Sequence, residues 1–134
     1  SMVVHGSRER LLGTNPLAIA LPTPAGHPPL VLDYATAAMA EGRVAVAATL
    51  GQPLPPGILI DADGRPTTEA AAFRRGGALL PFGGHKGSAL ALMIELLATT
   101  LAGSVPIALP GYRMGNPTLI LAWSVDRFCA PTAY

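Results

Sequence analysis

Charged residues, aromatic rings and cysteines are all scarce in this sequence of 134 residues. Only 13% of the residues are charged, 5% are aromatic and one is a cysteine, Cys129. The formal net charge is +1, and no aromatic residues are interleaved with Lys or Arg, so a nucleic-acid partner is not expected. A lone thiol cannot form an intramolecular disulfide, which is compatible with a reducing compartment, and we expect a cytoplasmic protein.

Long hydrophobic runs are missing as well, although half of the residues are hydrophobic. The longest run, residues 89–102, contains Glu95 and is shorter than the span of about twenty residues that crosses a bilayer. No membrane partner is therefore expected. Such an apolar chain with so few charges leaves apolar surface for something else to cover.

The hydrophobic pattern predicts one domain, residues 1–134, of mixed α/β class. We expect a largely antiparallel mixed sheet with helices packed on it, because strands and helices alternate irregularly and several connections are too short for crossovers. Ser1 and Met2 are interpreted as a cloning remnant. Strands are predicted over residues 17–21, 30–32, 58–60 and 118–125, the last with the strongest propensity. Helices are predicted over residues 37–50, directly after Thr36, and over residues 68–73 and 87–101.

The last of these helices has apolar residues on two faces. One face has helical spacing and consists of Leu90, Met93, Ile94, Leu97 and Leu101. A second face consists of Leu92 and Leu96. This pattern predicts a helix that is covered on two sides, with Gly103 just beyond its end.

The stretch PFGGHKG, residues 81–87 and here called the glycine loop, stands before this helix. Backbone N–H groups at a helix start attract anions, and Lys86 adds a point charge, so a phosphate is one candidate guest. The alternative is a tight turn that needs glycine for its own geometry and exposes its lysine. Spacing alone leaves both open, since the Walker loop and the dinucleotide fingerprint G-x-G-x-x-G are both absent.

Other polar positions also allow two interpretations. Asp33 follows a predicted strand and could cap the next helix or accept hydrogen bonds from a ribose. The stretch GTNP, residues 13–16, is typical of a turn held by Thr14 and Asn15. The stretch DADG, residues 61–64, is predicted to be a turn rather than a calcium loop, because later oxygen ligands are missing. Glu95 is expected to be a partnered or boundary carboxylate rather than a catalytic one. No metal site is expected, because the three histidines are isolated in sequence.

Four stretches taken together carry a family resemblance: LLGTNPLAIALP, LVLDYATAAMAEGRV, PLPPGILIDADGRPTTEAAA and GGALLPFGGHKGSALALMIELL. In this order they resemble the malate/L-lactate dehydrogenase family, which has a non-Rossmann NAD(P)-binding fold. The sequence motif GGHKGSA is most similar to that of the branch of Δ1-piperideine-2-carboxylate/Δ1-pyrroline-2-carboxylate reductases.

The resemblance implies an NAD(P)-binding domain of an oxidoreductase, with NADP(H) favoured and NAD(H) as the alternative. It implies hydride transfer between the nicotinamide and a 2-keto or 2-hydroxy acid or a cyclic 2-imino acid, in a homodimer. Thr14 matches a substrate-pocket position. The implied cofactor contacts are Leu32, Asp33, Tyr34, Gly83, Gly84, His85, Lys86 and Gly87. Candidate partners for a 2′-phosphate are Arg8, Arg10, Arg74 and Arg75.

Departures from the family pattern limit what the resemblance implies. The family's proton-donor histidine belongs to an N-terminal part that has no counterpart here, and its role is not transferred to His5, so no catalytic residue is assigned. Ala37 stands where many members have serine. The catalytic N-terminal and helical C-terminal parts of the family are also expected to be absent, and the chain alone is expected to be inactive. The alternatives are a non-catalytic oligomerisation or interaction domain, and a phosphate- or nucleotide-binding module without a redox role.

Overall fold

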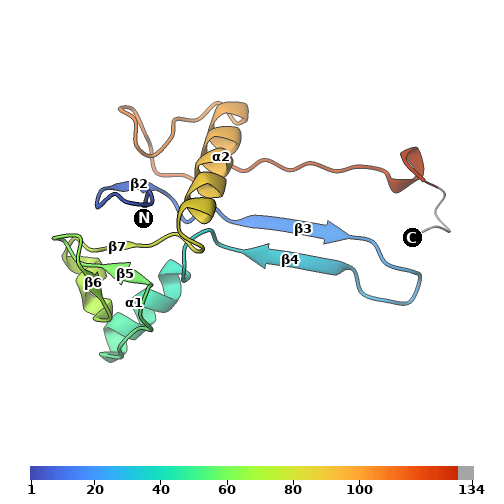
Figure 1. Ribbon diagram of the computed structural model, residues 1–134. Coiled ribbons are helices and arrows are strands. Elements are labelled where there is room, and N and C mark those ends of the chain that lie inside the picture. The colour runs from blue at the N-terminus through green and yellow to red at the C-terminus, as the bar shows by residue number, and fades with distance from the viewer. Residues whose placement is uncertain (130–134) are drawn as a thin grey trace.

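The computed structural model describes residues 1–129, which form a small mixed sheet with its helices and a hairpin that projects away from it (Figure 1). The end of the predicted domain, residues 130–134, lies outside the described residues. The strands of the sheet lie in the order β2-β1-β7-β5-β6. Their bounds are β1 Met2–Val3, β2 Arg10–Leu12, β5 Leu59–Ile60, β6 Pro66–Thr67 and β7 Ala78–Leu79. Only β1 and β7 are parallel, so the predicted largely antiparallel mixed sheet is confirmed.

The central strands of this sheet are buried on both faces. Leu79 pairs with Met2 on one side and with Leu59 on the other, and all three side chains join the main core cluster. Because side chains alternate along a strand, the adjacent residues face the other way. They form the smaller cluster: Val3, Ile60 and Ala78. Setting Met2 aside from the fold was therefore wrong, since its side chain is fully buried.

The helices differ from the predicted ones mainly at their starts. Helix α1 spans Glu41–Leu50 and so begins four residues later than predicted, because residues 36–38 bond to other segments instead of beginning a helix. Its predicted end is confirmed, with Gly51 in the left-handed conformation. The predicted short helix is a 3₁₀ helix, η1, over Ala70–Arg75. A further short 3₁₀ helix, η2, spans Val125–Arg127.

Helix α2, His85–Leu101, packs through small and polar residues rather than through its large apolar ones. Its buried residues are Gly87, Ser88, Ala91, Glu95 and Thr99. The predicted apolar faces are largely exposed: Leu92 (44%), Met93 (54%), Leu96 (42%), Leu97 (46%) and Leu101 (65%). The prediction that these faces are covered was wrong for the described chain. In residues 1–129 no helix combines the length and apolar character needed to cross a bilayer.

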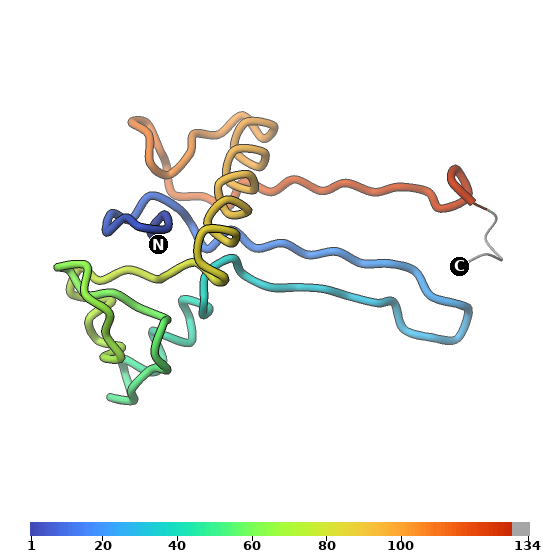
Figure 2. The backbone as a smooth tube through the Cα atoms, in the orientation of Figure 1, coloured from blue at the N-terminus to red at the C-terminus, as the bar shows by residue number. Residues whose placement is uncertain are grey.

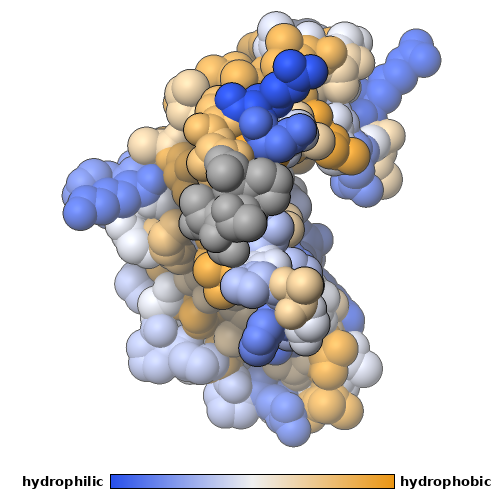
Figure 3. All heavy atoms as spheres, turned by 90° about the vertical axis from the view of Figure 1, so that its right-hand side faces the viewer, coloured by the Kyte–Doolittle hydropathy of each residue, from blue (hydrophilic) through white to orange (hydrophobic). Residues whose placement is uncertain are grey.

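The hairpin consists of β3, Leu17–Leu21, and β4, Leu30–Tyr34, which pair antiparallel along their whole length. This confirms the predicted pair of strands. In the connecting loop the Thr23 hydroxyl donates to the carbonyl oxygens of His27 and Pro28. Most side chains on both faces of the hairpin are exposed, including Leu30 and Val31. Apolar residues accordingly reach the surface when the molecule is viewed from this side (Figure 3).

The strand predicted over residues 118–125 was wrong. This segment is extended, but it pairs with no strand within the described residues (Figure 2). Its large side chains are exposed, Ile120 and Trp123 among them. β-branched and aromatic residues favour an extended backbone, but a strand is completed only by hydrogen bonds to a neighbour.

Candidate functional site

The predicted site residues come from three segments that meet at one end of α2. These segments are the glycine loop, the end of β4 and residues 13–16, which keep the name GTNP turn although they link β2 to β3 without a turn, so that the predicted turn was wrong. The end of β4 continues into Ala37, which forms an antiparallel bridge with Pro81, and Ala38 N–H donates to the Leu80 carbonyl at 2.8 Å. The structure thus joins the segments that carry Thr14, Asp33 and Lys86, although these segments are far apart in sequence.

Thr36 holds these segments together through its backbone and its side chain. Its N–H and its hydroxyl both donate to the Thr14 carbonyl at 2.9 Å, and the hydroxyl also lies 3.0 Å from the Asn15 carbonyl oxygen. Its own carbonyl accepts a hydrogen bond from Phe82 N–H in the glycine loop at 3.0 Å. Because Thr36 is fully buried, water cannot compete for these bonds. This residue therefore fixes the GTNP turn relative to the glycine loop.

Asn15 joins the same turn to helix α2. Its φ of 35° is positive, which few non-glycine residues other than Asn and Asp tolerate. In this conformation its side-chain amide donates to the Ala91 carbonyl at 2.9 Å. The expectation that Asn15 holds a local backbone group was wrong, because the bond reaches 76 residues along the chain. Glu95 is a partnered carboxylate, as expected, since it accepts a hydrogen bond from Ile107 N–H at 2.9 Å.

The backbone conformation and packing of the glycine loop require glycine at two of its positions. Gly84 precedes α2 with φ 60°, and a Cβ on Gly87 would lie 1.9 Å from the Phe82 carbonyl oxygen. Glycine at these two positions is thus explained by packing and conformation, without a ligand. Gly83 also has a positive φ, but a Cβ there would meet open space. Glycine content alone therefore does not identify a binding site.

His85 and Lys86 lie in the first turn of α2, which begins two residues earlier than predicted. Both side chains are exposed. The N–H groups of a first helical turn have no carbonyl partner within the helix, so they add partial positive charge beside the lysine. This end of α2 can accordingly attract an anionic group.

The residues of β4 lie beside this loop. The Tyr34 ring stands edge-on to the Phe82 ring, with centroids 5.4 Å apart and an interplanar angle of 86°. Leu32 and Asp33 are exposed on the hairpin. The helix-capping interpretation of Asp33 was wrong, because α1 starts after Ala40 without a side-chain cap. The Asp33 carboxylate is thus available to a ligand that extends from the loop along β4.

Sequence reasoning missed His5 as a neighbour of the glycine loop. Its N–H donates to the Ser88 hydroxyl at 3.0 Å, and its ring lies 6.0 Å from the His85 ring, between centroids. No local signal links positions 5 and 85, because their proximity follows from the pairing of β1 with β7. Thr36 was also missed as an anchor, although its place between a strand and an alanine-rich helix is a signal for a side-chain bond to backbone.

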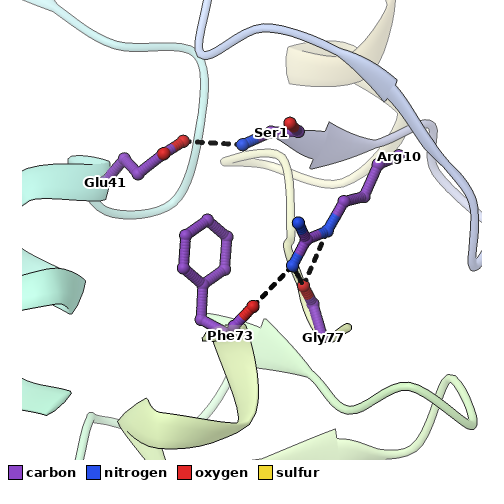
Figure 4. Close-up of polar contacts among 5 residues, drawn as sticks. All are labelled: Ser1, Arg10, Glu41, Phe73 and Gly77. Carbon is purple, nitrogen blue, oxygen red and sulfur yellow. Dashed lines mark hydrogen bonds and ion pairs between the residues drawn. The ribbon is translucent and has the colours of Figure 1, made fainter. Parts of the chain in front are cut away.

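Three of the four arginines considered for a 2′-phosphate are bound elsewhere. The Arg10 guanidinium donates to the carbonyls of Gly77 and Phe73 (Figure 4). Arg74 donates to the Thr49 hydroxyl at 2.9 Å, and Arg75 pairs with Glu69 at 2.6 Å. The hydrogen bond and the charge of Glu69 raise the pKa of Arg75 above its ordinary value. For Arg8, the Cβ lies close to Gly64.

The remaining polar features do not form a second site at the glycine loop. The predicted DADG turn is confirmed, since Asp61 accepts hydrogen bonds from the N–H groups of Asp63 and Arg65. Within residues 1–129, no three His, Cys, Asp or Glu side chains are grouped to hold a metal ion. A surface hollow of about 320 Å³ lies between α1 and η1, with Glu69 in its lining, and shares no residue with the three site segments.

Comparisons with known proteins agree on one family. A family model described as malate/L-lactate dehydrogenase matches residues 1–133. A Δ1-pyrroline-2-carboxylate/Δ1-piperideine-2-carboxylate reductase of Pseudomonas putida is 60% identical over 102 residues, which are 76% of this chain and 30% of that protein. An L-lactate dehydrogenase of Cupriavidus necator is 50% identical over 115 residues, 84% of this chain and 33% of that protein.

A solved structure is also similar to the chain. The Δ1-piperideine-2-carboxylate reductase of Pseudomonas syringae pv. tomato superposes with a TM-score of 0.72 at 56% identity, over 76% of this chain and 30% of that one. The chain therefore spans about a third of the length of the relatives it matches.

Replacement of Gly87 tests whether packing fixes the glycine loop. Gly87→Ala places a methyl group against the Phe82 carbonyl, and we expect a loss of about 1–3 kcal/mol in the free energy of unfolding. Gly42→Ala is the matched control, because Gly42 lies in α1 with open space around it. The free energy of unfolding of Gly42→Ala should increase by about 0.5–1 kcal/mol. Urea unfolding measures both, and equal effects would contradict the packing explanation.

Replacement of Thr36 tests the link between the segments. Thr36→Val removes the hydroxyl and keeps the shape, so buried carbonyl oxygens lose a partner at a cost of about 1–3 kcal/mol. Thr36→Ser should retain most of the stability. Thr100→Val, at an exposed position of α2, should change the free energy of unfolding by no more than about 0.5 kcal/mol. A Thr36→Val variant as stable as the control would show that this link is dispensable.

Proposed function

Because the chain belongs to the malate/L-lactate dehydrogenase family, we propose that it supplies the cofactor-binding part of an NAD(P)-dependent oxidoreductase. The observation that carries this proposal is the convergence of the GTNP turn, the end of β4 and the glycine loop on buried Thr36. Segments so far apart in sequence are held in one arrangement, which is what a binding site for an extended ligand requires.

The residues present fit a nicotinamide dinucleotide. Lys86, His85 and the first-turn N–H groups of α2 would receive its phosphates, and the exposed carboxylate of Asp33 could accept hydrogen bonds from a ribose. The edge-on rings of Tyr34 and Phe82 join the end of β4 to the glycine loop. Leu32, the open backbone at Gly83 and the backbone of Gly84 complete the proposed contacts. When bound, the cofactor would supply or accept the hydride, while the protein orients it.

The proposed substrate is a cyclic 2-imino acid, Δ1-pyrroline-2-carboxylate or Δ1-piperideine-2-carboxylate, with a 2-keto or 2-hydroxy acid as the alternative. The support is similarity: relatives with the imino acid name reach 60% identity, against 50% for the L-lactate dehydrogenase. Thr14 is the proposed substrate contact in this chain. Its backbone carbonyl is used by Thr36, which leaves its side chain for that role.

NADP(H) is the proposed cofactor, with NAD(H) as the alternative, and the proposal follows the similarity to the reductase branch. The contacts of Arg10, Arg74 and Arg75 with protein groups remove most of the arginines considered for a 2′-phosphate. We propose that the whole protein works as a homodimer in the cytoplasm.

A second candidate function is a non-catalytic interaction domain. It is favoured by the exposed apolar side chains on α2 and on the hairpin, such as Leu101 and Leu30. A chain with this function should associate and should bind no dinucleotide. A generic phosphate-binding module, in contrast, should respond to AMP and inorganic phosphate as well as to NADPH.

Titration with NADPH and NADH tests the proposed function directly. Binding at about 100 times the dissociation constant should stabilise the chain by about 2.7 kcal/mol, which raises the melting temperature by several degrees. Lys86 is the only lysine, and Lys86→Ala should weaken binding about tenfold. Arg74→Ala removes one positive charge at η1 and is the matched control. If neither nucleotide binds, or if both variants lose affinity equally, the proposed site is wrong.

Turnover by the chain alone is expected to be absent. No residue is assigned as the proton donor, so hydride delivery to a keto or imino acid would lack its proton. Turnover is measured as the decrease in NADPH absorbance when Δ1-piperideine-2-carboxylate or pyruvate is added to the chain. Steady-state oxidation of NADPH at rates typical of enzymes would show that the described residues include the missing acid.

A further inference from the structure

We infer that His5 is a further cofactor-contacting residue, which together with His85 and Lys86 binds a phosphate group of the dinucleotide. This inference rests on the proposed function and adds to it a residue from a segment that the resemblance left without a role. It starts from the strand pairing at the centre of the sheet.

Strands β1 and β7 are parallel and in contact, with Met2 opposite Leu79. The segments that follow two adjacent parallel strands leave the sheet at the same edge. Ligands of open sheets bind at the edge where such strands end. His5 follows β1, and the glycine loop follows β7. The pairing therefore delivers both to one place, although 80 residues separate His5 from His85.

The position of His5 is fixed by two contacts. Its N–H donates to the Ser88 hydroxyl, and Ser88 is buried in the first turns of α2. Its ring lies against Gly84, where a Cβ would come within 3.4 Å of Nδ1 and Cε1. The main chain behind it is also secured, since the turn after β1 closes with a bond from Ser7 N–H to the Val4 carbonyl. The imidazole is therefore held at the loop while it stays exposed.

The two imidazoles form an edge-on pair, with centroids 6.0 Å apart and an interplanar angle of 63°. Each ring carries an N–H that can donate to a phosphate oxygen, and His85 is followed by the Lys86 ammonium. The packing explanation that accounts for Gly84 and Gly87 does not account for these exposed donors. A phosphate is the group that this set of donors suits.

Binding measurements with a histidine control test the inference. His5→Ala should weaken NADPH binding about tenfold, the effect of one hydrogen bond to a charged group. His27→Ala is the matched control, because His27 is exposed in the loop of the hairpin. An equal loss for NADH would assign His5 to the pyrophosphate, and a loss for NADPH alone would assign it to the 2′-phosphate. Affinities equal to those of the control would overturn the inference.

Ring signals of the unaltered chain provide a second measurement that does not depend on the variant's folding. The chain has three histidines, and addition of NADPH should shift the ring resonances of His5 and His85 but not those of His27. A shift of His85 without His5 would overturn the inference and leave the proposed function intact. An unaltered chain that binds neither nucleotide would overturn both.

Discussion

The hydrogen bonds of Thr36 are the constraint on which the rest of the site depends. A single buried residue donates to the GTNP turn and accepts from the glycine loop, so neither segment can move without breaking a bond that water cannot replace. Asn15 adds a second attachment from the same turn to α2. The proposed site is thus built from backbone positions, and its exposed side chains are carried on a frame of hydrogen bonds within the chain.

This frame changes how the glycine loop should be interpreted. The sequence offered two explanations, a phosphate site and a tight turn, and the structure shows that Gly84 and Gly87 satisfy the second. The two explanations are not exclusive, because the same turn exposes Lys86 and His85, and the His5 ring lies beside the His85 ring. A binding site is therefore supported by donors that follow two separate strands, β1 and β7, and by family membership, whereas glycine spacing contributes little.

The sequence predicted the fold where local signals decide it. Prolines bound β3 and mark the turn-rich loop before β4, and Gly51 ends α1 as expected. It failed where distant partners decide. Thr36 was expected only to precede a helix, because nothing local shows that its hydroxyl bonds to the Thr14 carbonyl. Residues 118–125 have strand propensity but no neighbour among the described residues to complete a strand. For the site, the resemblance supplied the contacts, whereas His5 could be found only from the β1–β7 pairing.

The exposed apolar residues of α2 follow from the way this helix meets the site. It approaches the GTNP turn through Gly87, Ala91 and other small or polar residues, which let the backbone of Ala91 come close enough to bond Asn15. That contact turns the large residues, such as Met93 and Leu97, away from the sheet. One orientation of α2 therefore has two consequences. It allows the close approach that builds the proposed site, and it leaves an apolar surface outside that site.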